Sequence, residues 1–278
     1  MSEPRSWTLD VRGLAIHVWD LAGGDGIPIV CLHGWLDQGL AFARMAEGRG
    51  ERWVAPDQRG FGRSAHVGAG GWYHFSNYLM DLDALVKALG GTVHLVGHSM
   101  GGTVSVYYAG ARPERVRTLT LIEGMGALPT ADGSMLSRTK QFLDGLERPP
   151  SRIRLASLDA ATARLLERHP GLDPDHARLL AEHGTDPIGD GKVAWRFDTQ
   201  HLVRSPTPFY EEPFLEFARA VTAPVLIVWA SKSWYPREVQ ERRTAAFKSP
   251  RIERVDGTHM LPYDAPAVLA ALVGEHIR

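Results

Sequence analysis

The segment from Val93 to Ala111 constrains the fold of this chain more than any other. An apolar, β-branched run at Val93–Val96 leads directly into a Gly-x-Ser-x-Gly motif at Gly97–Gly101, and a helical pattern follows at Thr103–Ala111. A strand that turns into a helix through this motif holds the serine in a strained backbone and projects its hydroxyl from the edge of a sheet. The segment therefore predicts a nucleophile, Ser99, at the carboxyl edge of a sheet.

Other short apolar runs, separated by helical patterns, predict the rest of that sheet. They barely alternate in polarity, which is typical of strands covered on both faces. The runs are Ile27–Leu32, Trp53–Ala55, Val116–Ile122 and Val225–Trp229, and Leu14–Trp19 alternates more, as an edge strand does. A helix is expected at Tyr78–Leu89, ended by two glycines. Alternating strands and helices predict an α/β fold with a mostly parallel, doubly wound sheet.

The middle of the chain has a different pattern. Residues 125–215 are richer in Arg, Leu, Ala and Pro. Helical spacing is evident at Ser134–Leu146, Leu158–His169 and Pro174–His183. Because no strand core is evident there, we expect a helical lid inserted into one core made of residues 1–124 and 216–278, not an independent domain.

Composition narrows the classes of partner and compartment. The chain has 278 residues and a formal net charge of −1, so no basic excess predicts binding to nucleic acid or to an anionic membrane surface. No run of about 18 apolar residues predicts a membrane span. The N-terminus lacks the apolar core of a signal peptide, which makes a cytoplasmic protein the expectation. Nothing in the sequence predicts an oligomeric state.

No cofactor or metal is expected. No cluster of His, Cys and Asp has the spacing of metal ligands, and no glycine-rich phosphate loop is present. The single cysteine, Cys31, cannot form an internal disulfide. It lies in an apolar run, so we expect a small core residue and not a nucleophile.

A nucleophilic serine needs a general base, because its free hydroxyl is a poor nucleophile at neutral pH. His259 lies between the apparent last strand, Ile252–Val255, and a C-terminal helix, Pro266–Ile277. A histidine that comes last in the chain matches the order of α/β hydrolases. We therefore predict His259 as the base. The histidines of the middle stretch are expected at the surface: His169, His176, His183 and His201.

The strand at Ile27–Leu32 leads into a loop that begins with His33. In a sheet fold this loop can reach the nucleophile. The backbone N–H groups of Trp35 and Met100 are predicted to form an oxyanion hole. We expect His33 to order this loop and not to act as the base.

Four ordered pieces of the chain resemble the α/β-hydrolase superfamily: His33–Trp35, Asp57–Ser64, Gly97–Gly102 and His259. The resemblance implies an α/β-hydrolase fold, and it implies that the Asp57–Ser64 turn is structural. The chain is most similar to the serine hydrolase-like proteins. Three stretches carry that narrower resemblance: His33–Asp37, Leu121–Gly124 and Gly191–Asp198.

The catalytic acid departs from the commonest pattern of that superfamily. Many members place it after the seventh strand, in a stretch like Trp-Gly-x-x-Asp, but Trp229–Trp234 has no carboxylate and its serines cannot compensate a positive imidazolium. Other members take the acid from the end of the sixth strand, where this chain has Glu123. The resemblance therefore implies Glu123. Asp256 and Asp264 are the alternatives, and Asp264 is expected to cap the last helix.

These residues predict a serine hydrolase that cleaves a small-molecule carboxylic ester through an acyl-enzyme. Ser99 would attack, His259 would move the proton, and Glu123 would orient the ring. Two alternatives remain open. One is hydrolysis of a carbon–carbon bond in a diketone with the same residues. The other is a ligand-binding protein that retains the fold without catalysis.

Overall fold

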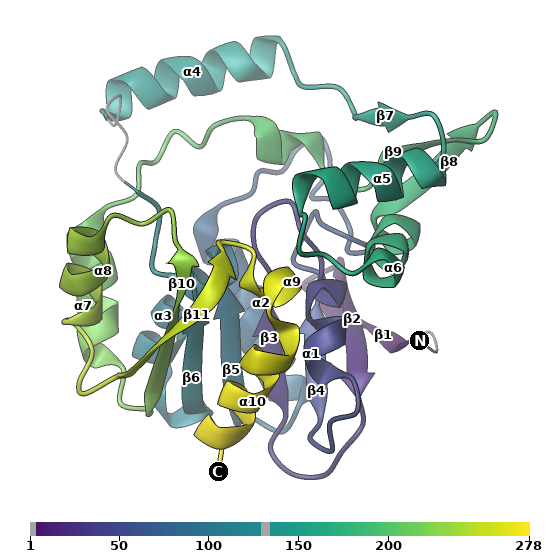
Figure 1. Cartoon of the computed structure of the whole chain (residues 1–278). Coiled ribbons are helices and arrows are strands. Elements are labelled where there is room, and N and C mark those ends of the chain that lie inside the picture. Colours follow the sequence, from purple (N-terminus) through teal and green to yellow (C-terminus); the bar gives the residue numbers. More distant parts are fainter. Residues whose placement is uncertain (1–3, 129–133) are drawn as a thin grey trace.

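The computed structural model describes residues 4–128 and 134–278. A central sheet has the strand order β1-β2-β4-β3-β5-β6-β10-β11 (Figure 1). Its strands are β1 (Arg5–Val11), β2 (Leu14–Ala22), β3 (Ile29–Leu32), β4 (Trp53–Pro56), β5 (Val93–His98), β6 (Val116–Ile122), β10 (Val225–Lys232) and β11 (Arg251–Thr258). Pairs β1–β2 and β2–β4 are antiparallel, and every other pair in this sheet is parallel. The predicted α/β class with a mostly parallel sheet is confirmed.

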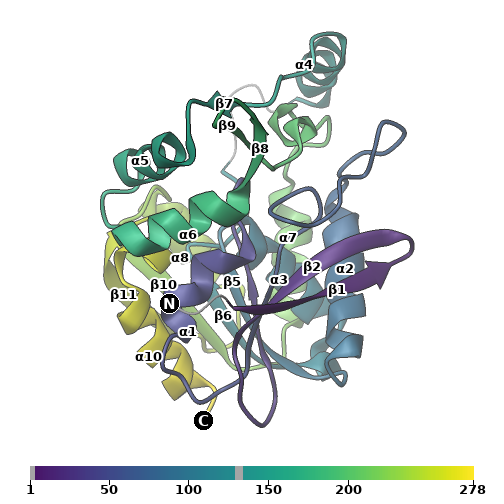
Figure 2. The same ribbon diagram turned by 90° about the vertical axis from the view of Figure 1, so that its right-hand side faces the viewer.

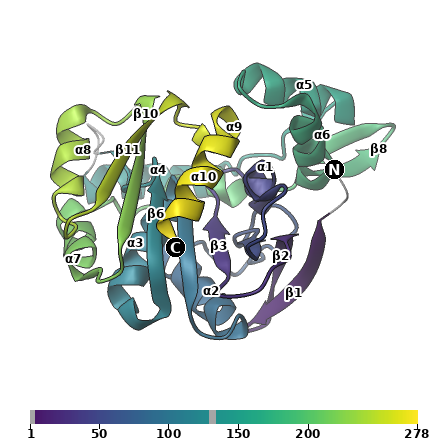
Figure 3. The same cartoon turned by 60° about the horizontal axis from the view of Figure 1, so that its bottom comes forward.

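Helices cover both faces of the sheet (Figure 3). One face packs against α1 (Ala43–Ala46) and α10 (Pro266–His276), and the other against α2 (Phe75–Ala88), α3 (Met100–Ala111) and α7 (Glu211–Ala220). The shorter elements are η1 (Gly39–Phe42), η2 (Pro113–Arg115), η3 (Thr199–Leu202), α8 (Arg237–Thr244) and α9 (Leu261–Asp264). Within the part of the chain that the structure describes, no helix has the length and apolarity to cross a membrane.

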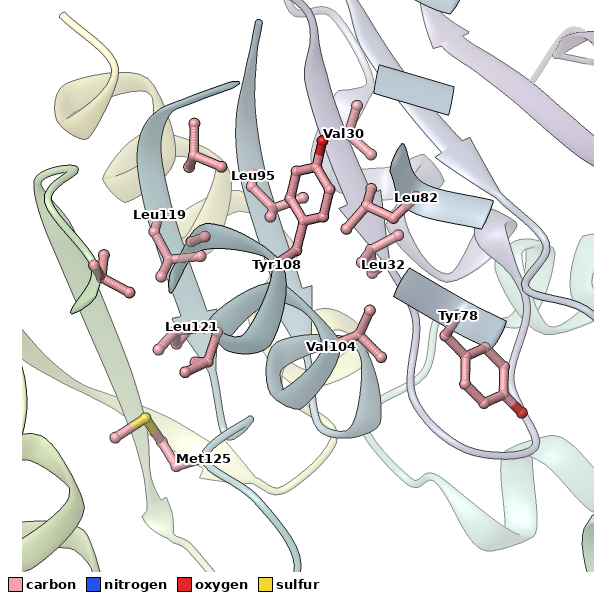
Figure 4. Close-up of a cluster of buried hydrophobic side chains, with 14 of the residues drawn as sticks. Val30, Leu32, Tyr78, Leu82, Leu95, Val104, Tyr108, Leu119, Leu121 and Met125 are labelled. Atoms are coloured by element: carbon pink, nitrogen blue, oxygen red, sulfur yellow. The ribbon is translucent and has the colours of Figure 1, made fainter. Parts of the chain in front are cut away.

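The two hydrophobic layers explain why the strand sequences do not alternate. Successive side chains of a strand point to opposite faces. In β5, Leu95 packs into the layer under α2 and α3, whereas Val96 packs into the layer under α1 and α10. Figure 4 shows Leu95 and Leu119 of the sheet beside Tyr108 of α3. Because both faces are buried, both sets of positions must be apolar.

The insertion contains the three expected helices, α4 (Met135–Glu147), α5 (Leu158–Arg168) and α6 (Pro174–Gly184). It also contains an antiparallel sheet of β7 (Arg154–Leu155), β9 (Lys192–Trp195) and β8 (Thr185–Gly189), which the sequence analysis did not predict. These strands are only 2 to 5 residues long, too short for a clear pattern. In Figures 1 and 2 the insertion lies beyond the carboxyl ends of the parallel strands. Residues 129–133 of the predicted lid lie outside the described residues.

The turn between β8 and β9 has a sequence that is typical of a β-hairpin. Asp190 and Gly191 both have positive φ, 52° and 71°. An Asp-Gly pair with this backbone is the preferred turn of a two-residue hairpin. The segments around this pair have helical spacing, so the hairpin was not predicted.

Candidate active site

Ser99 lies in the turn between β5 and α3, with φ 51° and ψ −117°. This is a conformation that residues with a β-carbon rarely adopt, and such strain clusters at functional sites. The turn leaves no space for a β-carbon at either of its glycines, because backbone atoms of neighbouring segments lie against both. A β-carbon at Gly97 would lie 2.5 Å from Gly102 Cα, and one at Gly101 would collide with the carbonyl oxygen of Leu32. The motif therefore needs glycine on both sides of the serine for steric reasons.

The structure brings Ser99, His259 and Glu123 into one row. Ser99 Oγ lies 2.9 Å from His259 Nε2, and His259 Nδ1 lies 3.2 Å from Glu123 Oε2. The carboxylate accepts a hydrogen bond from Nδ1–H, so Nε2 is left unprotonated and can accept a proton from the serine hydroxyl. All three residues predicted for the reaction thus meet at the carboxyl edge of the sheet.

Glu123 directly follows β6 and its side chain is 0% exposed. Both carboxylate oxygens are occupied. Oε1 accepts the backbone N–H of Ala230 at 2.8 Å, and Oε2 accepts the hydroxyl of Ser233 at 2.9 Å as well as His259 Nδ1. A buried carboxylate loses its hydration, and these donors compensate for that loss.

The two alternative carboxylates have other partners. Asp256 is exposed and accepts a hydrogen bond from Ser231 Oγ at 2.6 Å. Asp264 Oδ2 accepts the backbone N–H and the hydroxyl of Thr258, each at 2.6 Å. The expectation that Asp264 caps the last helix is wrong, because Ala265 holds that position without a side-chain hydrogen bond. Asp264 instead closes the loop that carries His259.

The loop after β3 lies against the nucleophile, as expected for an oxyanion hole. A β-carbon at Gly34 would lie 3.3 Å from Ser99 Cβ. Met100 is the first residue of α3, and the first N–H groups of a helix have no acceptor within the helix. The pairing of the Trp35 and Met100 N–H groups with an oxyanion stays a prediction.

His33 is buried and has the ordering contacts of a structural residue. Its Nε2 accepts the backbone N–H of Gln58 at 2.9 Å, so its proton is on Nδ1, which donates to the Gly34 carbonyl at 2.7 Å. Burial lowers the pKa of His33 to about 4. Cys31 is also fully buried, and desolvation raises the pKa of its thiol far above the usual value, which leaves it unreactive.

The sequence analysis missed two residues that support this row, His98 and Ser233. His98 Nε2 donates to the backbone carbonyl of His259 at 2.8 Å, so the residue before Ser99 anchors the loop that carries His259. Burial lowers the pKa of His98 to about 3, which keeps the ring neutral beside His259. The position of His98 beside Ser99 was its only sequence signal. Ser233 had none, because its contact with Glu123 spans 110 residues.

The histidines of the middle stretch are not surface residues, contrary to expectation. His176 and His183 are buried, and His169 and His201 are partly buried. His176 Nε2 donates to the Leu40 carbonyl at 2.8 Å. The ring of His201 stacks on Phe61 with centroids 3.9 Å apart. These side chains fasten the insertion to the core, which helical spacing alone does not reveal.

A cavity of about 760 Å³ opens beside Ser99. Its wall comes from α2, α3, Arg138 of α4, the segment after Glu123, residues 205–213 and the loop after β10. Aromatic side chains dominate it: Tyr73, Phe75, Tyr78, Tyr107, Phe209, Tyr210, Trp234 and Tyr235. Among the described lining residues there is no Asp or Glu. The cavity therefore favours an apolar group next to the serine.

Trp234 lines this cavity next to His259. The residue is 59% exposed, and its ring lies 4.0 Å from the ring of His259, centroid to centroid. Across residues 4–128 and 134–278, no group of three or more His, Cys, Asp and Glu side chains is arranged to hold a metal ion.

Comparison with known proteins identifies the family of this chain. A family model described as alpha/beta hydrolase fold matches residues 27–266. The serine hydrolase-like protein of Danio rerio is 30% identical over 62% of this chain and 55% of its own length, and that of Mus musculus is 24% identical over 95% and 92%. The thioesterase domain from the curacin biosynthetic pathway superposes with a TM-score of 0.88 at 27% identity, covering 98% of this chain and 99% of that domain.

The family match, the parallel sheet and these relatives lead to one conclusion. The chain belongs to the α/β hydrolase fold family and is a hydrolase that resembles the serine hydrolase-like proteins.

Proposed function

We propose that the protein hydrolyses a small-molecule carboxylic ester through an acyl-enzyme formed on Ser99. The observation that carries this proposal is the row from Ser99 Oγ to His259 Nε2 at 2.9 Å and from His259 Nδ1 to Glu123 at 3.2 Å. A serine hydroxyl is activated when a base within hydrogen-bond reach is itself oriented by a third group.

The reaction proceeds in two halves. Ser99 Oγ attacks the ester carbonyl while His259 Nε2 takes its proton, and the proton then passes to the departing alcohol. A water molecule then attacks the acyl carbonyl while it gives a proton to the same nitrogen, and that proton returns to Ser99 Oγ as the bond to the serine breaks and the acid is released. Glu123 offsets the positive charge that the imidazole carries in both halves, and the N–H groups of Trp35 and Met100 stabilise the oxyanion.

The cavity supports an apolar acyl group as the part of the substrate next to Ser99. Its aromatic wall and the absence of Asp and Glu among the described lining residues favour a neutral group over a cationic one. The thioesterase domain that this chain resembles supports acyl thioesters as a second kind of substrate, because attack on either carbonyl needs the same residues.

The first experiment combines a fluorophosphonate probe with a panel of para-nitrophenyl esters from acetate to decanoate and one acyl thioester. We expect the probe to label the wild type and not Ser99→Ala, and we expect hydrolysis by Ser99→Ala to fall at least about 10³-fold. A melting curve of the variant checks that it is folded.

Three outcomes separate the alternatives. Labelling with hydrolysis of any ester supports the proposal. Labelling without ester or thioester hydrolysis, combined with cleavage of a diketone, indicates carbon–carbon bond hydrolysis. No labelling and no turnover indicate a ligand-binding protein on the hydrolase fold.

A further inference from the structure

We propose that Ser233 is a positioning residue of the hydrolytic site, whose hydroxyl fixes the Glu123 oxygen that faces His259. This inference rests on the proposed function. Ser233 Oγ and His259 Nδ1 share one acceptor, Glu123 Oε2, at 2.9 Å and 3.2 Å. Ser233 therefore contacts Glu123 Oε2, the same oxygen that orients the imidazole of His259.

The direction of the Ser233 hydrogen bond is set by the loop itself. A hydroxyl has one proton and two lone pairs. The backbone N–H of Tyr235 donates to Ser233 Oγ at 3.2 Å, which occupies a lone pair. The carboxylate has no proton to give, so the Ser233 proton points to Glu123 and the charged oxygen receives a charge-assisted bond.

The end of β10 holds the other half of the carboxylate. The backbone N–H of Ala230 donates to Glu123 Oε1 at 2.8 Å. With one oxygen held by Ala230 and the other by Ser233, the carboxylate plane cannot turn away from the imidazole. The end of β10 and the loop after it thus contribute no acid of their own but determine where the Glu123 carboxylate points.

A simpler explanation is that Ser233 only closes a turn through its contact with Tyr235. That role would change the stability of the loop and leave the proton chemistry of the site unaltered. The two explanations differ in the pH dependence of the reaction. Removing a donor from an anion makes the Glu123–His259 pair take up a proton more readily, so the acid limb of kcat/KM should move to higher pH.

The titratable groups near Glu123 and His259 determine whether a shift of the acid-limb midpoint can be assigned to this pair. Asp256 and Asp264 lie on the loop that carries His259, where they accept hydrogen bonds from Ser231 and Thr258. Two further titratable groups, His98 and Tyr235, lie close to the pair. Burial lowers the pKa of His98 to about 3 and raises the pKa of Tyr235 to about 12. Neither group changes charge between about pH 5 and 9, so a moved midpoint reports on the pair.

The test compares Ser233→Ala with Ser233→Thr and with a matched control, Ser231→Ala. Ser231 is at the end of β10, two residues before Ser233, and its hydroxyl bonds Asp256 and the Gly257 N–H, not Glu123. We expect Ser233→Ala to lower kcat about 10- to 100-fold with KM within about threefold, and to move the acid-limb midpoint upward. Ser233→Thr keeps the hydroxyl and should restore both quantities. Ser231→Ala should resemble the wild type.

An unmoved midpoint in Ser233→Ala overturns the proposal whatever the loss of rate, and so does an equal shift in Ser231→Ala. If Ser233→Ala does not fold, Ser233→Cys replaces it. Its weaker donor should give a smaller upward shift, and no shift again overturns the proposal. Wild-type protein that hydrolyses no ester overturns the proposed function together with this inference, whereas active wild type with an unchanged Ser233→Ala overturns only the inference.

Discussion

Two residues of the candidate site have a backbone that only glycine adopts without strain. Ser99 has φ 51° and Glu123 has φ 48°. Each such residue costs about 1–3 kcal/mol and persists only where its neighbours hold it in place. The Ser99 N–H donates to the Ile122 carbonyl at 3.1 Å, and the Glu123 N–H donates to the Val228 carbonyl at 3.1 Å. The strain turns both side chains away from their own strands and toward His259.

At this scale the decisive change is Glu123→Gln, which keeps the size of the side chain and removes its charge. We expect kcat to fall about 10²- to 10⁴-fold, because an amide cannot offset the imidazolium charge. Steady-state kinetics of the ester that the wild type cleaves best would measure this fall. Asp256→Asn is the matched control, since Asp256 is exposed and bonds Ser231.

A Glu123→Gln variant within about threefold of wild type, beside an inactive Asp256→Asn variant, would show that the acid belongs to the His259 loop. If neither change lowers kcat, Ser99 and His259 act as a dyad without a carboxylate.

At the scale of elements, α8 holds the wall of the cavity through Arg243. This side chain is fully buried. Its Nη1 donates to the carbonyls of Met125 and Gly126 at 2.6 Å and 2.8 Å, and its guanidinium carbon lies 5.0 Å from the centroid of the Phe209 ring. An ion pair with Glu211 at 2.7 Å fixes the N-terminus of α7. The two ends of the insertion are therefore fastened to one helix of the core.

Phe209 is the cavity residue through which the insertion should control the size of the substrate. Its ring lines the cavity, whereas Leu143 of α4 is exposed and Phe142 packs on Trp72. We expect Phe209→Ala to shift the preferred acyl chain to a longer one, because it removes a large part of the wall. For acetate, kcat should stay within about tenfold of wild type, equal to about 1.4 kcal/mol of barrier.

The measurement is the same ester panel, with Leu143→Ala as the control that should keep the wild-type profile. A uniform collapse of kcat for every ester, in a variant whose melting curve shows a folded protein, would mean that Phe209 supports the chemistry and not the size of the substrate.

At the scale of the whole molecule, many histidines are kept neutral by burial. Desolvation lowers the pKa of five of them to about 3 or 4: His17, His33, His94, His98 and His201. In the unfolded chain these rings take up protons near pH 6.5, roughly the reference value. As pH falls below that value, these rings become protonated in the unfolded state but stay neutral in the folded state. The free energy of unfolding therefore decreases.

Three buried acids act in the opposite direction, because burial raises the pKa of Asp37, Asp57 and Asp81. Burial raises the pKa of Asp37 and Asp57 to about 6, so the folded state takes up these protons first and is stabilised between about pH 6 and 4. Because the histidines outnumber these acids, we expect a net loss of stability on acidification. The melting temperature should fall on the order of 10 °C between about pH 6.5 and 4.5.

Differential scanning calorimetry across this range would measure the fall. His94→Gln should reduce the slope, because His94 lies away from the reacting groups and bonds only Thr118 Oγ1 among the contacts described. A melting temperature that is constant or rises on acidification would contradict this account.

The sequence by itself determined the order of the core strands and the position of the candidate nucleophile. The strands of the sheet and the turn at Gly97–Gly101 depend on local patterns, namely apolar runs of strand length and glycines where no β-carbon fits. Because residues close together in the sequence encode these features, the sequence alone was enough to predict them. Glu123 was accessible only through resemblance, since nothing local distinguishes it from a loop carboxylate.

The tertiary structure alone decided which side chains support one another across the chain. The bond from Ser233 to Glu123 spans 110 residues, and the one from His98 to the His259 carbonyl spans 161. The small sheet of the insertion and the buried His176 also depend on partners distant in sequence. Such contacts arise when the carboxyl ends of parallel strands meet at one edge of the sheet. The periodicity of a segment indicates which of its faces is buried, but it does not identify the residue that packs against that face.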